Sequence, residues 1–117
     1  MQVLFESRDP EGAQLRAVAE RRVRFVMRRL TWLVPRAKVQ LSDVNGPRGG
    51  VDKRCHLELK TDSGKEVVVT AMARDWQSAL NVALGRAARA LMRSWRRGRD
   101  HTRTRGSSRL RSLVMER

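Results

Sequence analysis

The spacing of apolar residues changes twice along this chain of 117 residues, and these changes constrain its fold more than any single motif. Apolar residues recur at helical intervals through residues 11–33, then alternate with polar residues in short segments, and return to helical intervals after residue 75. A period near 3.6 residues indicates an amphipathic helix, whereas a period of two indicates a strand with one buried face. The chain therefore combines both kinds of element in one α+β domain.

The expected order of elements is β-α-β-β-β-α. One-sided alternation in the strands implies a four-stranded sheet with both helices packed on one face. The strands are predicted at residues 2–7, 37–44, 54–60 and 67–72, and the helices at residues 11–33 and 75–97.

Turn-forming and capping residues separate these elements. Pro35 is expected to end the first helix, because proline lacks the N–H that a helix interior needs. The glycines and proline of residues 45–50 indicate a loop, and Asp62-Ser63-Gly64 indicates a hairpin turn. Asp75 is a predicted N-cap for the second helix. Residues 1–97 thus form the predicted domain, and the basic, polar residues 98–117 are expected to be a flexible tail.

The charge of the chain restricts its partners. The formal net charge is +14, from 26 basic and 12 acidic residues, and only four of the basic residues are lysines. Such an excess favours a polyanion, which leaves nucleic acid and an anionic membrane surface as candidates. Arginine grips phosphate bidentately and stacks on bases, so the arginine bias favours RNA, although a GC-rich genome produces the same bias.

The second helix carries its charge on one face. Its arginines fall within about one third of the helix circumference, opposite the apolar stripe, at about 100° per residue. No acidic residue occurs between Trp76 and Arg99, whereas a solvated helix face usually mixes both signs. This favours a polyanion-binding face over a merely soluble basic one. The predicted contacts are Arg86, Arg89, Arg93, Arg96 and Arg97.

The first helix adds a second basic surface. Arg22 and Arg29 lie at the edge of its apolar stripe and are expected to flank a groove if the two helices lie side by side. Arg28 is assigned to the outer face. Phe25 and Trp32, one heptad apart, either stack on RNA bases or pack against the neighbouring helix, and burial statistics favour packing.

The sequence offers no catalytic or metal centre. Cys55 and His56 are adjacent on a predicted strand, so they point to opposite faces and cannot form a nucleophile–base pair. A single cysteine forms no internal disulfide, which fits a cytoplasmic setting. The first residues lack the pattern of a signal peptide, so we expect none, and no apolar run has membrane-spanning length. We expect no enzyme activity, cofactor, metal ion or small-molecule substrate.

With these features, the chain resembles the bacterial hibernation-promoting factor and ribosome-associated inhibitor family, also called the sigma-54 modulation family. The resemblance covers about residues 1–97. It rests on the element order, on the run Ala73-Arg74-Asp75-Trp76-Gln77-Ser78-Ala79-Leu80, on the arginine spacing of the second helix, and on Leu15-Arg16 and Arg22 in the first.

The resemblance implies a function that depends on binding and involves no catalysed reaction. Members of the family dock between the head and body of the small ribosomal subunit near the decoding centre, where they block the messenger and transfer RNA sites. By resemblance, the arginines of the second helix would be the main ribosomal RNA contacts, with Arg22 and Arg29 secondary. The protein would be cytoplasmic, ribosome-associated and monomeric when free. Long members have a dimerisation domain that residues 98–117 are too short to form, so this chain is not expected to pair ribosomes by itself.

Two other functions remain open. The α-β-β-β-α order is also that of a general double-stranded RNA-binding module, although the first strand and the lack of a lysine-rich start to the last helix argue against it. A protein-interaction role in modulating a transcription factor is the second alternative. Membrane binding is disfavoured, because the sheet needs the apolar stripe of the second helix for its core.

Overall fold

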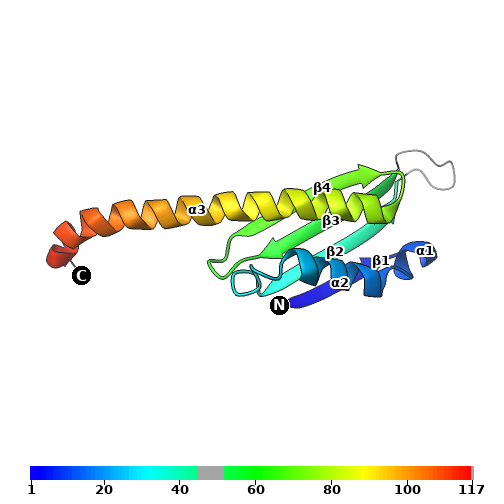
Figure 1. Ribbon diagram of the computed structural model, residues 1–117, viewed down its shortest axis with the longest axis horizontal. Coiled ribbons are helices and arrows are strands. Elements are labelled where there is room, and N and C mark those ends of the chain that lie inside the picture. The colour runs from blue at the N-terminus through cyan, green and yellow to red at the C-terminus, as the bar shows by residue number, and fades with distance from the viewer. Residues whose placement is uncertain (45–51, 117) are drawn as a thin grey trace.

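The element order β-α-β-β-β-α is confirmed in the computed structural model of the chain (Figure 1). The structure describes residues 1–44 and 52–116, with side chains for residues 1–44 and 52–97, so the predicted loop at residues 45–50 lies outside the described residues. The strands are β1 (Gln2–Ser7), β2 (Arg36–Asp43), β3 (Lys53–Lys60) and β4 (Glu66–Ala73), and the helices are α1 (Pro10–Ala13), α2 (Arg16–Val26) and α3 (Trp76–Glu116).

The four strands form one sheet in sequence order. β1 is parallel to β2, because α1 and α2 carry the chain back along the sheet, and the other neighbours are antiparallel hairpin partners. Val39 in β2 pairs with Phe5 on one side and Leu57 on the other, and all three side chains are buried. Alternate residues point the opposite way, so the sheet has a core face and an open face.

Both longer helices cover the core face, as the sequence predicts (Figure 1). α2 contributes Ala19 and Val23 to the core, and α3 contributes Leu80 and Leu84, all of which are almost fully buried. Cys55 on β3 lies in the same core, which confirms its predicted burial. Desolvation raises the pKa of its thiol to about 12, so it remains protonated and unreactive at neutral pH.

The prediction of a single helix over residues 11–33 is wrong in two places. The helical segment breaks at Leu15, between α1 and α2, and α2 ends at Val26. Pro35 therefore does not end the helix, because residues 27–33 already form successive turns.

The physical reason is a local tightening of the backbone. The N–H of Leu30 bonds to the carbonyl of Met27, and the N–H of Leu33 bonds to that of Leu30, so each bond spans three residues. Three residues per turn keep these side chains on one side of the backbone, where an α-helix would rotate them progressively away. Met27 is fully buried as a result, and the two leucines pack partly against the core.

The predicted turn and cap are both present. The Thr61 N–H bonds to the Lys65 carbonyl across the hairpin, and Gly64 has a φ of 86°, a conformation that favours glycine. Asp75 caps α3, since its Oδ1 accepts the Ser78 N–H at 2.7 Å. That bond also lowers the pKa of the Asp75 carboxyl.

α3 includes most of the C-terminal segment, and the flexibility of residues 98–117 stays a prediction. α3 continues without interruption to Glu116 and extends past the end of the sheet (Figure 1). No proline occurs after Pro47, and arginine is a good helix former, although the glycines, threonines and serines of this segment disfavour a helical backbone. The division of the chain at residue 97 remains a prediction. No helix among the described residues is long and apolar enough to cross a membrane.

Candidate nucleic-acid interface

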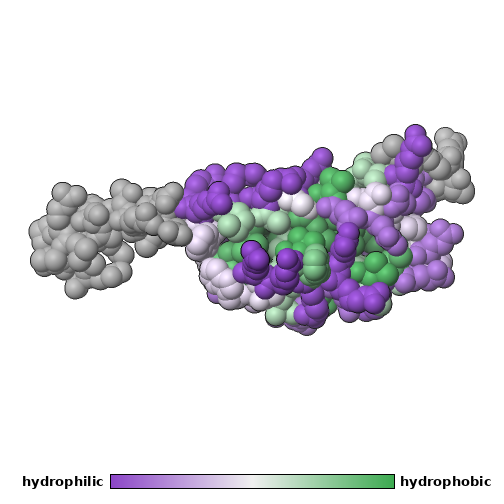
Figure 2. All heavy atoms as spheres, viewed as in Figure 1, coloured by the Kyte–Doolittle hydropathy of each residue, from purple (hydrophilic) through white to green (hydrophobic). Residues whose placement is uncertain are grey.

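The five predicted arginines of α3 are all exposed. They lie on the side of the helix opposite the buried Leu80, Ala87 and Leu91, because α-helical geometry rotates successive residues by about 100°. We call Arg86, Arg89, Arg93, Arg96 and Arg97 the arginine ridge. In Figure 2, hydrophilic surface lies along the upper edge of α3 next to its grey part, above a hydrophobic surface.

Acidic side chains do not compensate the arginine ridge. The ion pairs among the described side chains use Lys38, Lys53 and His56 as the basic partner, and none uses an arginine. Arg86 Nη1 donates a hydrogen bond to the Thr70 carbonyl of β4, at 3.4 Å. Among the side chains that the structure describes, no carboxylate pairs with these exposed guanidinium groups.

The open face of the sheet has the opposite character. Lys38 lies 3.7 Å from Glu6, whose carboxylate also accepts a hydrogen bond from Gln40 at 2.8 Å. These two partners lower the pKa of Glu6. His56 contacts both Thr70 and Glu58. Charges of both signs alternate on this face, so it resembles an ordinary solvated surface and contrasts with the ridge.

Arg22 and Arg29 lie apart from most of the ridge. Arg22 Nε donates to Asn81 Oδ1 of α3 at 2.9 Å, which ties the two helices together. Arg29 lies in the groove between α2 and α3. Arg86, in contrast, reaches toward β4, on the other side of α3. The predicted site residues thus lie on two adjoining surfaces, the ridge along α3 and the α2–α3 groove.

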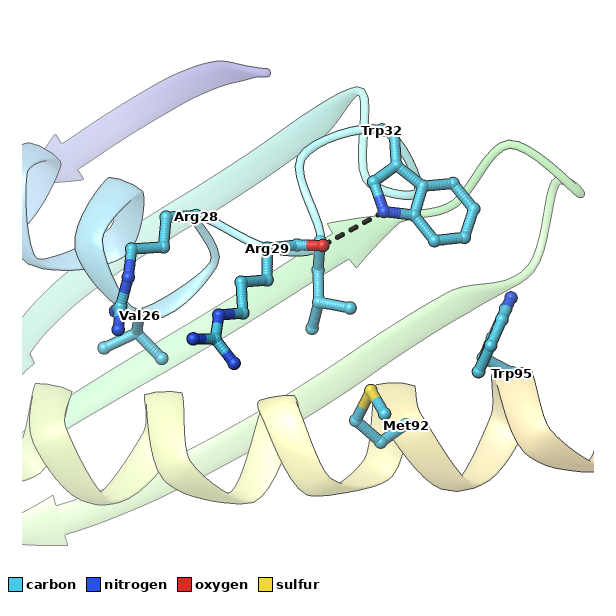
Figure 3. Close-up of a pocket in the computed structure, with 7 residues that line it drawn as sticks. Val26, Arg28, Arg29, Trp32, Met92 and Trp95 are labelled. Atoms are coloured by element: carbon cyan, nitrogen blue, oxygen red, sulfur yellow. Dashed lines mark hydrogen bonds between the residues drawn. The ribbon is translucent and has the colours of Figure 1, made fainter.

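The groove widens into a pocket near the C-terminal end of α2. It has a volume of about 480 Å³ and combines arginines with aromatic and aliphatic walls (Figure 3). Its lining residues are Val26, Arg28, Arg29, Leu30, Trp32, Met92 and Trp95. Helical spacing predicts Arg28 on the outer face and does not predict that Trp95 lies near Trp32, because α2 ends earlier than its sequence indicates.

Two aromatic residues are more exposed than predicted. Phe25 is 57% exposed and does not pack against α3, so the favoured prediction of packing is wrong for it. The Arg28 guanidinium covers part of its ring, 4.3 Å from the ring centroid. Trp32 does reach α3, where its ring meets Trp95 edge to face at 6.1 Å, but it is still 59% exposed.

The described residues hold no group of histidines, cysteines and carboxylates suited to a metal ion. Cys55 points into the core and His56 to the open face, as the strand period requires. Lys53 lies between Asp43 and Asp52, at 2.7 and 3.5 Å, and its ammonium is 5.0 Å from the centre of the Trp76 ring. Asp43 raises the pKa of Lys53, which indicates a structural ion pair.

Comparison with known proteins identifies the fold. No protein-family model matches the sequence, and no curated protein matches it. Among solved structures, the N-terminal domain of Protein Y from Thermus thermophilus superposes with a TM-score of 0.61 and 22% sequence identity. The match covers 80% of this chain and 98% of that domain. The chain therefore shares the fold of the Protein Y N-terminal domain.

Proposed function

We propose that this protein binds the small ribosomal subunit near the decoding centre through its basic helices. Bound there, it blocks the messenger and transfer RNA sites and silences translation without chemistry. The observation that carries the proposal is the arginine ridge, which is exposed along one side of α3 and has no acidic partner among the described residues.

A packed helix holds the ridge in place. Leu80, Leu84 and Leu91 on the opposite side of α3 are almost fully buried, so the helix does not rotate on the sheet. With a rise of about 1.5 Å per residue, the ridge from Arg86 to Arg97 spans about 16 Å. A preorganised row of this length contacts several phosphates at once with little entropy lost on binding.

Structured RNA is the polyanion that best fits these residues. Guanidinium groups form bidentate bonds to phosphate and stack on bases, which lysine does not do. The fold shared with Protein Y is the one that the resemblance to the hibernation-promoting family implies. Residue by residue, that resemblance assigns the ridge to the main ribosomal RNA contacts, with Arg22 and Arg29 secondary.

Co-sedimentation with purified small subunits on a sucrose gradient tests the proposal. We expect binding that weakens steeply with salt, because each neutralised phosphate releases counterions. The double variant Arg89→Glu/Arg93→Glu is expected to lose binding and to stop inhibiting an in vitro translation reaction.

Arg54→Glu is the matched control. Arg54 is also an exposed arginine, but it lies on the open face of the sheet, where its Nε donates to Ser42. We expect this variant to keep most of the binding. Equal loss in both variants would mean that net charge alone drives association, and full binding by the ridge variant would refute the proposal.

A general duplex-RNA module is the competing function. β1, parallel to β2 at the sheet edge, is an element that the α-β-β-β-α order lacks. Binding to a plain RNA duplex as tightly as to small subunits would favour that alternative.

A further inference from the structure

We propose that the pocket between α2 and α3 holds one unpaired nucleobase of the bound RNA, stacked on Trp32. This inference rests on the proposed function, because it assumes that RNA lies across the helical layer. It adds a site that reads an unpaired base, whereas the ridge contacts the backbone.

The pocket has the size and wall chemistry of a site for a planar ring. Its volume of about 480 Å³ lies within the range of about 300–1,000 Å³ that is usual for ligand pockets. Val26 and Leu30 on the α2 side and Met92 on α3 provide apolar walls (Figure 3). Trp32 and Trp95 close one end of the pocket.

Trp32 is oriented for stacking and not for hydrogen bonding. Its indole Nε1 already donates to the Arg29 carbonyl at 3.0 Å, which fixes the side chain against its own turn (Figure 3). More than half of the side chain remains exposed, at 59%. A rigid, exposed indole with its polar group satisfied offers a π surface to any base, whatever its sequence.

The charges around the pocket favour an anionic ligand. Arg28 and Arg29 line it, and none of its lining residues is acidic. Arg28 is held by its bond to the Phe25 carbonyl, at 2.8 Å. No side-chain hydrogen bond or ion pair to another described residue holds the Arg29 guanidinium, so it is available for the phosphate next to the inserted base.

The pocket is continuous with the arginine ridge. Met92 lies one turn before Arg96 on α3, and Arg89 lies about one turn before Met92, so the pocket wall and the ridge are adjacent on one helix. A strand held by Arg89 and Arg96 therefore passes the pocket mouth. An apolar peptide would gain nothing from the arginines, and a duplex offers no free base, so we favour a single-stranded or looped segment.

The test compares two RNA hairpins with the full chain. One has a loop of adenosines, and the other has the same backbone with abasic nucleotides in the loop. The wild-type protein is expected to bind the adenosine loop about 5-fold to 100-fold more tightly, the usual effect of stacking one base on an aromatic side chain. Its tryptophan fluorescence should be quenched by the adenosine loop only.

Trp32→Leu is expected to bind both hairpins equally, while Trp32→Phe restores most of the preference because it restores an aromatic ring. Phe25→Leu is the matched control. Phe25 lies on α2 and is about as exposed as Trp32, but it does not line the pocket. This variant should keep the preference for the adenosine loop.

Three results would overturn the inference. The first is equal binding of both hairpins by the wild-type protein, and the second is a preference for the adenosine loop that Trp32→Leu leaves unchanged. The third is quenching of the tryptophan fluorescence by an acidic phenylalanine-containing peptide at a lower concentration than by the adenosine loop. Each of these results is compatible with co-sedimentation of the protein with small subunits, so the proposed function would still stand. Loss of co-sedimentation by the wild type would instead remove the proposed function, and the hairpin assay does not depend on ribosomes.

Discussion

Arg22 of α2 and Asn81 of α3 are joined by a hydrogen bond of 2.9 Å, although they lie far apart in the sequence. The bond crosses the groove between the helices and orients an arginine that the sequence assigns to RNA contact. Only Nε is engaged with Asn81, so the outer nitrogens of the guanidinium remain directed to solvent. The groove edge is thus built by both helices together.

The Arg22–Asn81 bond leads to the first prediction. Asn81→Ala is expected to cost less than about 1.5 kcal/mol of unfolding free energy, because the bond is exposed, and to weaken RNA binding modestly by freeing Arg22. Asn81→Asp keeps a partner for Arg22 but adds a negative charge, so it should retain stability and bind RNA less well. Urea denaturation and a filter-binding titration measure the two effects. Tighter RNA binding by Asn81→Asp would contradict a role of this edge in the interface.

The second prediction concerns the repulsion within the arginine ridge. Arg93 has one arginine a turn before it, Arg89, and two arginines a turn after it, Arg96 and Arg97. Arg93→Glu replaces three repulsive pairs with three attractive ones, each worth about 0.2–0.5 kcal/mol. The variant should therefore unfold at a higher temperature while it loses RNA affinity, with the salt slope reduced by about one.

Thermal unfolding and a salt titration of RNA binding check this opposition. Arg54→Glu on the open face serves as the control for a change of net charge. A fall in the unfolding temperature of Arg93→Glu would mean that Arg93 has a structural role that its exposure does not suggest.

The third prediction contrasts two glycines in helices. A Cβ at Gly12 in α1 would collide with the Ser7 hydroxyl, which itself donates to the Leu41 carbonyl of β2. Gly12→Ala should therefore destabilise the protein by about 1–3 kcal/mol. At Gly85 in α3 a Cβ would meet only Arg89 Nη1, at 3.6 Å, so Gly85→Ala should stabilise by about 0.5–1 kcal/mol.

Chemical denaturation of both alanine variants in parallel measures these opposite shifts. Stabilisation of the protein by Gly12→Ala would show that the Ser7 hydroxyl does not lie against Gly12.

The fourth prediction follows from the buried thiol. Burial raises the pKa of Cys55 from 9.0 to about 12, so above pH 9 the unfolded chain releases this proton before the folded protein does. The folded state then binds more protons than the unfolded state. Between pH 9 and 12 the Cys55 thiol should therefore lower the free energy of unfolding by about 1.4 kcal/mol for each pH unit. Below pH 9 the thiol should not affect how stability depends on pH.

Urea denaturation across this pH range measures the slope, with Cys55→Ala as the comparison. That variant should be less stable at neutral pH, because it leaves a cavity, but its stability should fall less steeply with alkaline pH. Rapid alkylation of the native thiol at neutral pH would contradict the burial.

Much of the fold was predictable because it depends on local pattern. The alternation Cys55, Leu57, Leu59 placed β3 with its correct inward face, and Asp75 marked the start of α3. The arginine ridge was predictable for the same reason, since residues on one helix have a known angular relation. The end of α2 was not predictable from local pattern, because the turns from Met27 onward are stabilised by packing on the sheet.

The pocket shows where pattern was insufficient. Trp32 and Trp95 are separated by about half of the chain, and nothing in the spacing of either predicts that their rings meet. The exposure of Phe25 was likewise missed, because a burial preference averages over many proteins and ignores the shape of this groove.

The sequence by itself determined the order of the elements, the inward faces of the strands and the row of arginines opposite the apolar stripe of α3. These follow from periodicity, which acts over a few residues. Only the tertiary structure decided that Arg22 contacts Asn81 and that Trp32 meets Trp95. It also decided that Glu6 and Glu58 pair with basic residues on the open face, and that no described carboxylate pairs with the ridge. Such relationships depend on how distant segments pack on one sheet, and no local rule contains that information.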